Sequence, residues 1–192
     1  ATLYLYMDNY SHMPDQSPRL SIYRVKQDWA EMEATWNQRI SGASWGTAGC
    51  ESSADRDTTE SAAKVVSALS TWYDWNITSL VQGWVSSPSS NRGMVMISNI
   101  SREVRFYTSN DVDARFHPYL RVDYIPGGSP GSTSTATPVT PNVTPIVTPA
   151  PVEIRGASQD TYINKLDPSK NYENKPMVIR GVGEKRALLK FD

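Results

Sequence analysis

The chain is poor in the residues that build disulfides and metal centres. Its 192 residues include one cysteine, Cys50, and two histidines, His12 and His117. A single cysteine forms neither an internal disulfide nor a cysteine-based zinc site, and two histidines nearly exclude a multi-histidine metal centre. Cys50 is therefore expected to be a small buried or loop thiol, with a disulfide to another molecule as the alternative.

The chain also lacks an excess of charge of either sign and any long apolar run. It carries 19 Lys and Arg against 20 Asp and Glu, a net charge of −1 at pH 7. General nucleic-acid binding needs a basic surface that neutralises phosphates, so this balance argues against it. No apolar stretch approaches the ~18 residues of a membrane-spanning helix. Hydrophobic residues make up 39% of the chain, which is enough for a folded core.

Proline and aromatic residues, in contrast, are abundant. The chain has 13 Pro, 10 Tyr and 6 Trp, a composition that suggests a β-rich extracellular protein of a kind that often binds sugars or proteins. Short runs of apolar residues, several of them alternating with polar ones, predict strands. These runs cover residues 2–7, 20–25, 94–97, 104–107, 119–124, 160–163, 176–180 and 187–191. Many short strands separated by turn residues predict an all-β fold, a jelly-roll-like β-sandwich.

Two stretches have a helical pattern instead. Ile77, Leu80, Val81 and Trp84 have the spacing of one helix face, which predicts a helix over residues 77–85. A weaker pattern of the same kind covers residues 61–69.

Residues 127–152 form a linker of distinct composition. Pro, Thr, Ser and Gly fill 18 of its 26 positions, and it contains no charged residue. Such a segment cannot bury a core, and its Thr-Pro steps favour the extended polyproline II conformation. At ~3.1 Å per residue it could span roughly 80 Å, far enough to return to its own domain or to reach a neighbour. Dense Thr and Ser beside Pro are also typical of O-glycosylated stalks.

The segment after the linker, residues 153–192, is too short to fold alone. It holds about three predicted strands in 40 residues, and it contains neither a disulfide nor a cysteine-based metal site. A domain of this size rarely buries enough apolar surface to be stable. The segment is therefore expected to pair with another sheet.

Several motifs of residues 1–126 resemble those of the DNRLRE domain, also called the disaggregatase-related repeat. They are Trp29-Ala30-Glu31, Ala34-Thr35-Trp36-Asn37, Trp45-Gly46-Thr47-Ala48-Gly49, Trp75-Asn76-Ile77-Thr78-Ser79-Leu80-Val81-Gln82-Gly83-Trp84, Asn91-Arg92-Gly93 and Pro118-Tyr119-Leu120-Arg121-Val122. Family members usually carry Asp where Asn76 stands, a small departure. Some members of the family are classed as carbohydrate-binding modules.

The resemblance also implies an order of segments. Residues 157–163 and 186–192 are similar to the N-terminal part of this domain, which in the family precedes the strand at residues 1–6. The chain thus carries the domain in permuted order, as one repeat of a tandem array cut within the domain. Residue 1 is Ala and no signal peptide is present, so a processed chain or a fragment is expected.

This order predicts a donor and an acceptor. Residues 1–126 form the main part of the sandwich, and residues 153–192 complete it, either within the chain or in the next subunit by strand addition. A head-to-tail exchange whose rotation does not close a ring gives an open filament. The donor residues expected to become buried or paired are Asp160, Tyr162, Ile163, Val178, Leu188, Leu189 and Phe191.

Tryptophans are the main candidates for ligand contacts. Trp29, Trp36 and Trp84 stand at motif positions and are expected in the core. Trp45, Trp72 and Trp75 lie near predicted loops, and any of them that faces solvent is a candidate glycan contact. Secondary candidates are Tyr10, Tyr23 and Tyr73.

Oxygen-rich clusters and short motifs offer weaker candidates. Asp55, Asp57, Asp111 and Asp113 lie in predicted loops and are weak candidates for a structural calcium ion, the one cofactor considered, although turn chemistry explains them as well. Glu31 and Glu33 alternate on a predicted strand and would share a face, as glycosidase carboxylates can. Residues 42–46 match Gly-x-Ser-x-Gly, but that motif needs a parallel α/β sheet, which the all-β pattern lacks. No catalytic residue is assigned.

Three sequons are candidate glycosylation sites. They begin at Asn76, Asn99 and Asn142, and the last lies in the linker.

Two functions remain open on these grounds. The favoured one is a non-catalytic subunit of an extracellular or cell-surface filament, with neighbouring copies of the chain as partners. The alternative is a carbohydrate-binding module of a secreted protein that binds or degrades polysaccharide. The filament predicts strand exchange between chains and a buried linker. The module predicts a solvent-facing aromatic strip or an acidic groove, and a domain complete within one chain.

Overall fold

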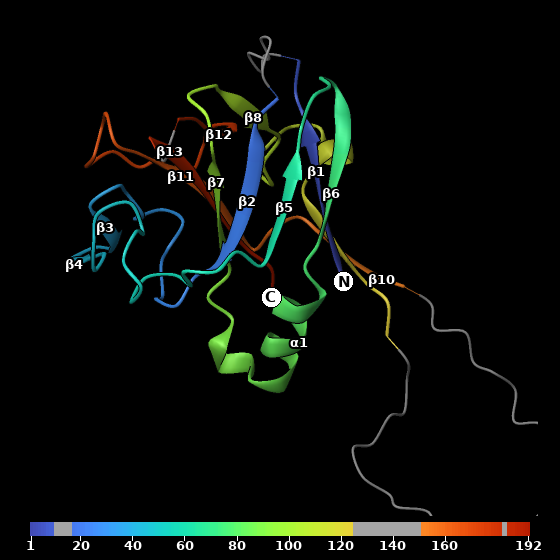
Figure 1. The fold of residues 1–192 in the computed structure, drawn as a ribbon, viewed down its shortest axis with the longest axis horizontal. Coiled ribbons are helices and arrows are strands. Elements are labelled where there is room, and N and C mark those ends of the chain that lie inside the picture. Colours follow the sequence, from blue (N-terminus) through green and yellow to red (C-terminus); the bar gives the residue numbers. More distant parts are fainter. Residues whose placement is uncertain (10–16, 125–150, 182–183) are drawn as a thin grey trace, which may run out of the picture.

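The computed structural model describes residues 1–9, 17–124, 151–181 and 184–192. These residues form an antiparallel β-sandwich with one α-helix (Figure 1), as the strand pattern predicts. The strands are β1 (Thr2–Met7), β2 (Arg19–Arg24), β3 (Gln38–Ile40), β4 (Ala43–Ser44), β5 (Ala62–Val65), β6 (Thr71–Asn76), β7 (Met94–Ser98), β8 (Val104–Phe106), β9 (Tyr119–Val122), β10 (Val152–Arg155), β11 (Gln159–Asn164), β12 (Met177–Ile179) and β13 (Lys185–Lys190). The helices are α1 (Thr78–Ser86) and two short 3-10 turns, η1 (Pro88–Ser90) and η2 (Ala114–Phe116). None of the helices in the described ranges has the length and hydropathy that a membrane span requires.

The first sheet is built around β1. Along its whole length β1 pairs with β6, and on its other side it pairs first with β9 and then with β8. Beyond these two neighbours lie β10, next to β9, and β12, next to β8. The second sheet has the order β11-β13-β7-β2-β5.

The core lies between the two sheets. It is formed by side chains at alternate positions along the strands. In β1, Leu3, Leu5 and Met7 are fully buried, while the residues between them are only half-buried. The inner side of the second sheet contributes residues such as Ile22 and Leu189. Successive side chains on a strand point to opposite faces, so one apolar position in two is enough to fill this space.

A long loop of the same chain covers the outer side of the second sheet. A long connection between β2 and β5, here termed the covering loop (residues 25–61), packs Trp29, Trp36 and Trp45 onto it. Under the loop lie apolar residues of the sheet, among them Val95 and Leu188. The inner strands β7 and β13 of this sheet are therefore buried on both faces, which explains their apolar runs Met94-Val95-Met96-Ile97 and Ala187-Leu188-Leu189.

The segment after the linker completes both sheets in the same chain. It adds β10 and β12 to the first sheet and β11 and β13 to the second, where β13 lies between β11 and β7. All of the predicted donor residues are buried, and they lie in β11, β12 and β13 or, for Phe191, just after β13. The linker lies outside the described residues, apart from its last two positions. Exchange between chains stays a prediction.

Two predicted elements are wrong, and five strands were missed. The helix pattern at residues 61–69 contains β5, a strand that pairs with β2, so tertiary pairing overrides a weak local preference. Residues 31–33 form a turn rather than a strand. Besides β5, the strands β3, β4, β6 and β10 were not expected, although β6 pairs with all six residues of β1. The helix predicted over residues 77–85 is confirmed as α1.

Candidate functional site

Six aromatic side chains gather on the outer side of the first sheet. Alternation turns Tyr4 and Tyr6 of β1 outward, and pairing places Asp74 beside Tyr4 and Trp72 beside Tyr6. On the other side of β1, Tyr119 of β9 is the partner of Tyr4. All six rings are half-buried, in contact with each other but with part of their surface open. This aromatic face consists of Tyr4, Tyr6, Trp72, Tyr107, Phe116 and Tyr119.

The rings of the aromatic face form one connected set. Tyr4 stacks on Tyr119 with centroids 4.5 Å apart, and Trp72 meets Tyr119 edge-on at 5.2 Å. Tyr6 links this pair to the rest, since it lies 5.3 Å from Trp72 and stacks on Phe116 at 4.2 Å. Such ring pairs contribute about 0.5–1.5 kcal/mol each beyond the burial of their area, so the set is held in a fixed arrangement.

Charged groups flank the rings in register. Reading across four strands, Asp74, Tyr4, Tyr119 and Arg155 lie side by side. The Arg155 guanidinium lies 4.7 Å from the centre of the Tyr119 ring, and Asp74 forms an ion pair with Lys64. Adjacent strands are about 4.8 Å apart, so this row is roughly 14 Å long.

Tyr107 and Tyr119 of the aromatic face are hydrogen-bond donors at neutral pH. Burial, together with the nearby Tyr4 and Glu153, raises the pKa of Tyr119. Burial also raises the pKa of Tyr107, with a smaller contribution from Asp111. The face therefore offers ring surfaces, neutral phenol hydroxyls and, at its edge, a carboxylate and a guanidinium.

A family model describes most of this architecture. The model of the disaggregatase related repeat domain matches residues 1–122, well over half of the chain. The chain belongs to this family. No curated protein and no solved structure matches it. The match ends where β9 ends, so the strands that complete the sandwich of this repeat domain, β10 to β13, lie beyond the matched residues.

The three tryptophans predicted as glycan contacts, Trp45, Trp72 and Trp75, differ in how deeply the repeat domain buries them. Trp72 is part of the aromatic face, as a glycan contact would require. Trp75 is only 1% exposed and packs against Phe106. Trp45, a residue of the covering loop, is buried between that loop and the second sheet, and its indole N–H donates to the Thr35 carbonyl at 3.0 Å. These two predictions are wrong, because neither ring reaches the surface.

The other tryptophan predictions are confirmed. Trp29, Trp36 and Trp84 are all buried. Of the secondary candidates, Tyr73 is buried and Tyr10 lies outside the described residues.

Most rings of the aromatic face were not predicted from the sequence. The alternation of Tyr4 and Tyr6 with buried leucines was a usable signal, because it turns both tyrosines to one side. Nothing local indicated Tyr107, Phe116 or Tyr119, which reach the face only through the loop that ends in β9 and through the pairing of β9 with β1.

The calcium candidates do not converge in the repeat domain. Asp55 is fully buried and accepts backbone N–H groups of Gly46 at 2.7 Å and Thr47 at 3.0 Å. Burial alone would raise the pKa of Asp55, but these hydrogen bonds and those from Ser52 outweigh it, and the pKa is lowered. The described residues contain no cluster of three or more Asp, Glu, His or Cys suited to a metal ion.

The other three aspartates have local partners. Asp57 pairs with Arg24, and the Asp111 carboxylate accepts the backbone N–H of Asp113 at 3.1 Å. Asp113 pairs with Arg115, whose hydrogen bonds lower the pKa of Asp113 to about 2.

The predicted carboxylate pair is separated. The Glu33 carboxylate accepts the backbone N–H of Ser41, while that of Glu31 accepts the backbone N–H of Asp160 at 3.2 Å. Burial and the nearby Asp160 charge raise the pKa of Glu31, and burial raises that of Asp160. Glu31 thus meets a carboxyl from the far end of the chain, and the fully buried Asp160 is closed to any ligand.

The Gly-x-Ser-x-Gly motif does not form a nucleophile elbow. Its serine, Ser44, ends the small β3–β4 hairpin, and no helix follows it. His117 contacts the Asp111 carbonyl at 2.8 Å.

Two of the three sequons lie at the surface. The asparagines Asn76 and Asn99 are exposed, and Asn142 lies outside the described residues.

Proposed function

We propose that this disaggregatase-related repeat domain binds polysaccharide through its aromatic face and does no chemistry on it. The observation that carries the proposal is the connected set of six half-buried rings on the outer side of the first sheet. The outer side of the other sheet is buried under the covering loop, so openness is a property of this face in particular.

The chemistry of the face suits a sugar chain. Apolar faces of pyranose rings pack on aromatic rings, while sugar hydroxyls need hydrogen-bonding groups at the ring edges. Tyr4 and Tyr119 supply both, and Asp74 and Arg155 extend the row at either end. An extracellular setting belongs to the same proposal, because polysaccharides occur outside the cell and because the exposed sequons of Asn76 and Asn99 could be glycosylated in a secreted protein.

Binding of soluble polysaccharides to the full chain tests this proposal. Trp72→Ala and Tyr119→Ala are each expected to weaken binding at least about tenfold in titration calorimetry, as loss of a central aromatic contact does. Tyr124→Ala is the matched control, because Tyr124 is half exposed and lies outside the aromatic face. Equal binding by all three variants and the unmodified chain would rule out the aromatic face as the binding site.

A second candidate function is the subunit of an extracellular filament built by strand exchange. One observation favours it. Val122 of β9 and Val152 of β10 are direct partners in the sheet, yet residues 123–151 separate them in sequence. A hairpin between adjacent antiparallel strands needs only two loop residues. Twenty-nine residues could extend roughly 90 Å in polyproline II form, enough to reach a neighbouring copy.

Exchange would preserve the contacts that β10 to β13 make within the chain. The balance between closed and exchanged forms then depends on protein concentration, since a covalent tether gives the chain's own segment an effective concentration of the order of millimolar. Closed monomers are expected in dilute solution and exchanged oligomers at high concentration.

Light scattering and electron microscopy over a concentration series test the second candidate. A variant in which Asn-Gly replaces residues 123–151 is expected to stay monomeric, because the short turn holds β10 beside its own β9. If the unmodified chain forms no oligomer at any concentration, the filament function is wrong.

A further inference from the structure

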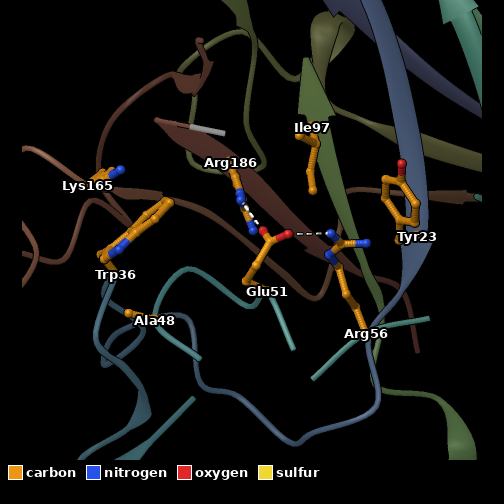
Figure 2. Close-up of a pocket in the computed structure, with 8 residues that line it drawn as sticks. All are labelled: Tyr23, Trp36, Ala48, Glu51, Arg56, Ile97, Lys165 and Arg186. Atoms are coloured by element: carbon orange, nitrogen blue, oxygen red, sulfur yellow. Dashed lines mark hydrogen bonds and ion pairs between the residues drawn. The ribbon is translucent and has the colours of Figure 1, made fainter. Parts of the chain in front are cut away.

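A cavity of about 440 Å³ lies on the opposite side of the sandwich from the aromatic face. It opens between the covering loop and the outer side of the second sheet, where β2, β7 and β13 contribute Tyr23, Ile97 and Arg186. Figure 2 shows two arginines converging there on one carboxylate, that of Glu51. Of the lining residues, Tyr23 was a secondary candidate for a ligand contact, but the sequence analysis did not single out the two arginines or Glu51.

Arg186 is the more deeply buried of the two arginines. Its side chain is 8% exposed, and its guanidinium lies 5.2 Å from the centre of the Trp36 ring. One terminal nitrogen donates to the Gly49 carbonyl at 2.6 Å and the other pairs with Glu51, while Nε has no hydrogen-bond partner.

Arg56 approaches from the covering loop with a matching arrangement. Its side chain is 13% exposed and lies over Tyr23, 4.4 Å from the ring centre. Nη2 donates to Glu51 at 3.0 Å, Nη1 donates to the Asp57 carbonyl at 3.1 Å, and Nε again has no partner. Each guanidinium is thus stacked on an aromatic ring and held in place.

Positive charge exceeds negative charge around this cavity. Lys165 also lines it, so three cations face one carboxylate. The nearest acids of the covering loop are engaged elsewhere, Asp55 with backbone N–H groups and Asp57 with Arg24. Burial lowers the pKa of Arg186 even though Glu51 opposes this shift, so one carboxylate does not fully offset the buried charge.

We propose that this cavity binds an oxyanion, the carboxylate or sulfate group of an acidic ligand, between Arg56 and Arg186. Planar guanidinium groups bind such oxyanions through paired, charge-assisted hydrogen bonds. Glu51 occupies the place of the ligand's oxyanion in the unliganded protein. Its side chain is 45% exposed, so it can swing towards solvent and leave both guanidiniums to the ligand. Trp36 and Tyr23 then flank the bound group. The site is independent of the aromatic face and of polysaccharide binding there.

Titration with sodium sulfate and with sodium acetate, at constant ionic strength set by chloride, tests the proposal. Amide chemical shifts of the full chain are expected to change at residues lining the cavity and to saturate with at least one of the two anions. A response to only one anion decides between a sulfate and a carboxylate ligand. Failure of both to give saturable shifts at these residues overturns the proposal.

Variants separate a binding site from a purely structural ion-pair network. Glu51→Gln is expected to tighten anion binding several-fold, because the competing charge is gone, whereas a structural network would only be weakened. Arg56→Gln is expected to weaken binding about tenfold or more.

Lys165→Gln, at an exposed position that does not endanger folding, is expected to weaken binding about two- to fivefold. Lys175→Gln, an exposed lysine outside the cavity, is the matched control and is expected to change nothing. Weaker binding in Glu51→Gln, or equal binding in the two lysine variants, would contradict the proposal.

Discussion

The two outer faces of the sandwich both arise from the alternation of side chains along strands, but one face is partly open to solvent and the other is buried. On the first sheet, the outward residues of β1, Tyr4 and Tyr6, are aromatic and remain partly open. On the second sheet, outward residues such as Val95 and Leu188 are aliphatic and are buried under the covering loop. Purely aliphatic positions on both sides of a strand require cover, whereas rings with polar groups tolerate water. The chemistry of the outward side chains therefore indicates which face is free to bind a ligand.

The largest contrast is expected from truncating one residue on each face. Leu188→Ala should lower the free energy of unfolding by about 2–5 kcal/mol, because it leaves a cavity between sheet and covering loop. Tyr4→Ala should cost much less, about 1 kcal/mol, since it removes cross-strand ring contacts at a partly open surface. Urea denaturation of both variants measures the difference. Similar costs would mean that the covering loop contributes little to the stability of the face beneath it.

Substitution of two glycines of the covering loop tests how tightly the loop is packed against the second sheet. Both Gly42 and Gly49 have positive φ, but a Cβ at Gly49 would lie 2.5 Å from the Trp36 ring, while one at Gly42 would meet nothing within 4 Å. Gly42→Ala should cost about 1–2 kcal/mol from backbone strain alone. Gly49→Ala should cost about 1–3 kcal/mol more, because it also displaces Trp36. Thermal unfolding compares them, and equal costs would show that Trp36 moves freely.

Two buried aspartates should give opposite pH dependence. The pKa of Asp55 is lowered below 3.8 in the folded protein, so its stabilising contribution is present above pH 3.8 and is lost as pH falls through the folded value. The pKa of Asp160 is raised, so its contribution is present below pH 3.8 and is lost as pH rises through the folded value.

The free energy of unfolding, measured from pH 2 to 7 for the unmodified chain and two variants, checks the pH dependence expected of both aspartates. Asp55→Asn is expected to reduce the loss of stability on acidification. Asp160→Asn is expected to reduce the decline in stability above pH 3.8. An unchanged slope in either variant would contradict the corresponding assignment.

The smallest effect is expected from the ion pair at the edge of the aromatic face. Lys64 and Asp74 are both partly exposed, so Lys64→Met should change the free energy of unfolding by about 0.2–1 kcal/mol. The change should shrink further in high salt, because salt screens exposed charges. Urea denaturation at two salt concentrations measures it, and a salt-independent loss would indicate packing by the lysine stem instead.

Much of the fold could be predicted from local pattern. Alternation located β1, β2, β8, β9 and β11, and spacing located α1, because both depend only on residues close in sequence. The segment after the linker was expected to need another sheet, and it does complete both sheets. The strand β5 was missed for the opposite reason, since Ala62–Val65 is a strand only through its pairing with β2.

The candidate site was far less predictable than the fold. Trp45, Trp72 and Trp75 were equivalent in sequence, yet only Trp72 reaches the surface. Which tryptophan is exposed depends on the register of β6 against β1 and on the packing of the covering loop, with Trp45, onto the second sheet. The cavity at Arg186 depends on Glu51 and Arg56, more than a hundred residues away in the chain.

The sequence by itself determined many of the strands, the inward leucines and the composition of the linker, because alternation and proline content act within a few residues. Only the tertiary structure decided which face stays open, which rings meet and which charges converge. Those outcomes depend on the pairing of segments as distant as residues 2–7 and 71–76, or 94–98 and 185–190. A strand's own residues fix which side chains share a face, but the neighbouring strands and covering loops fix what those side chains contact.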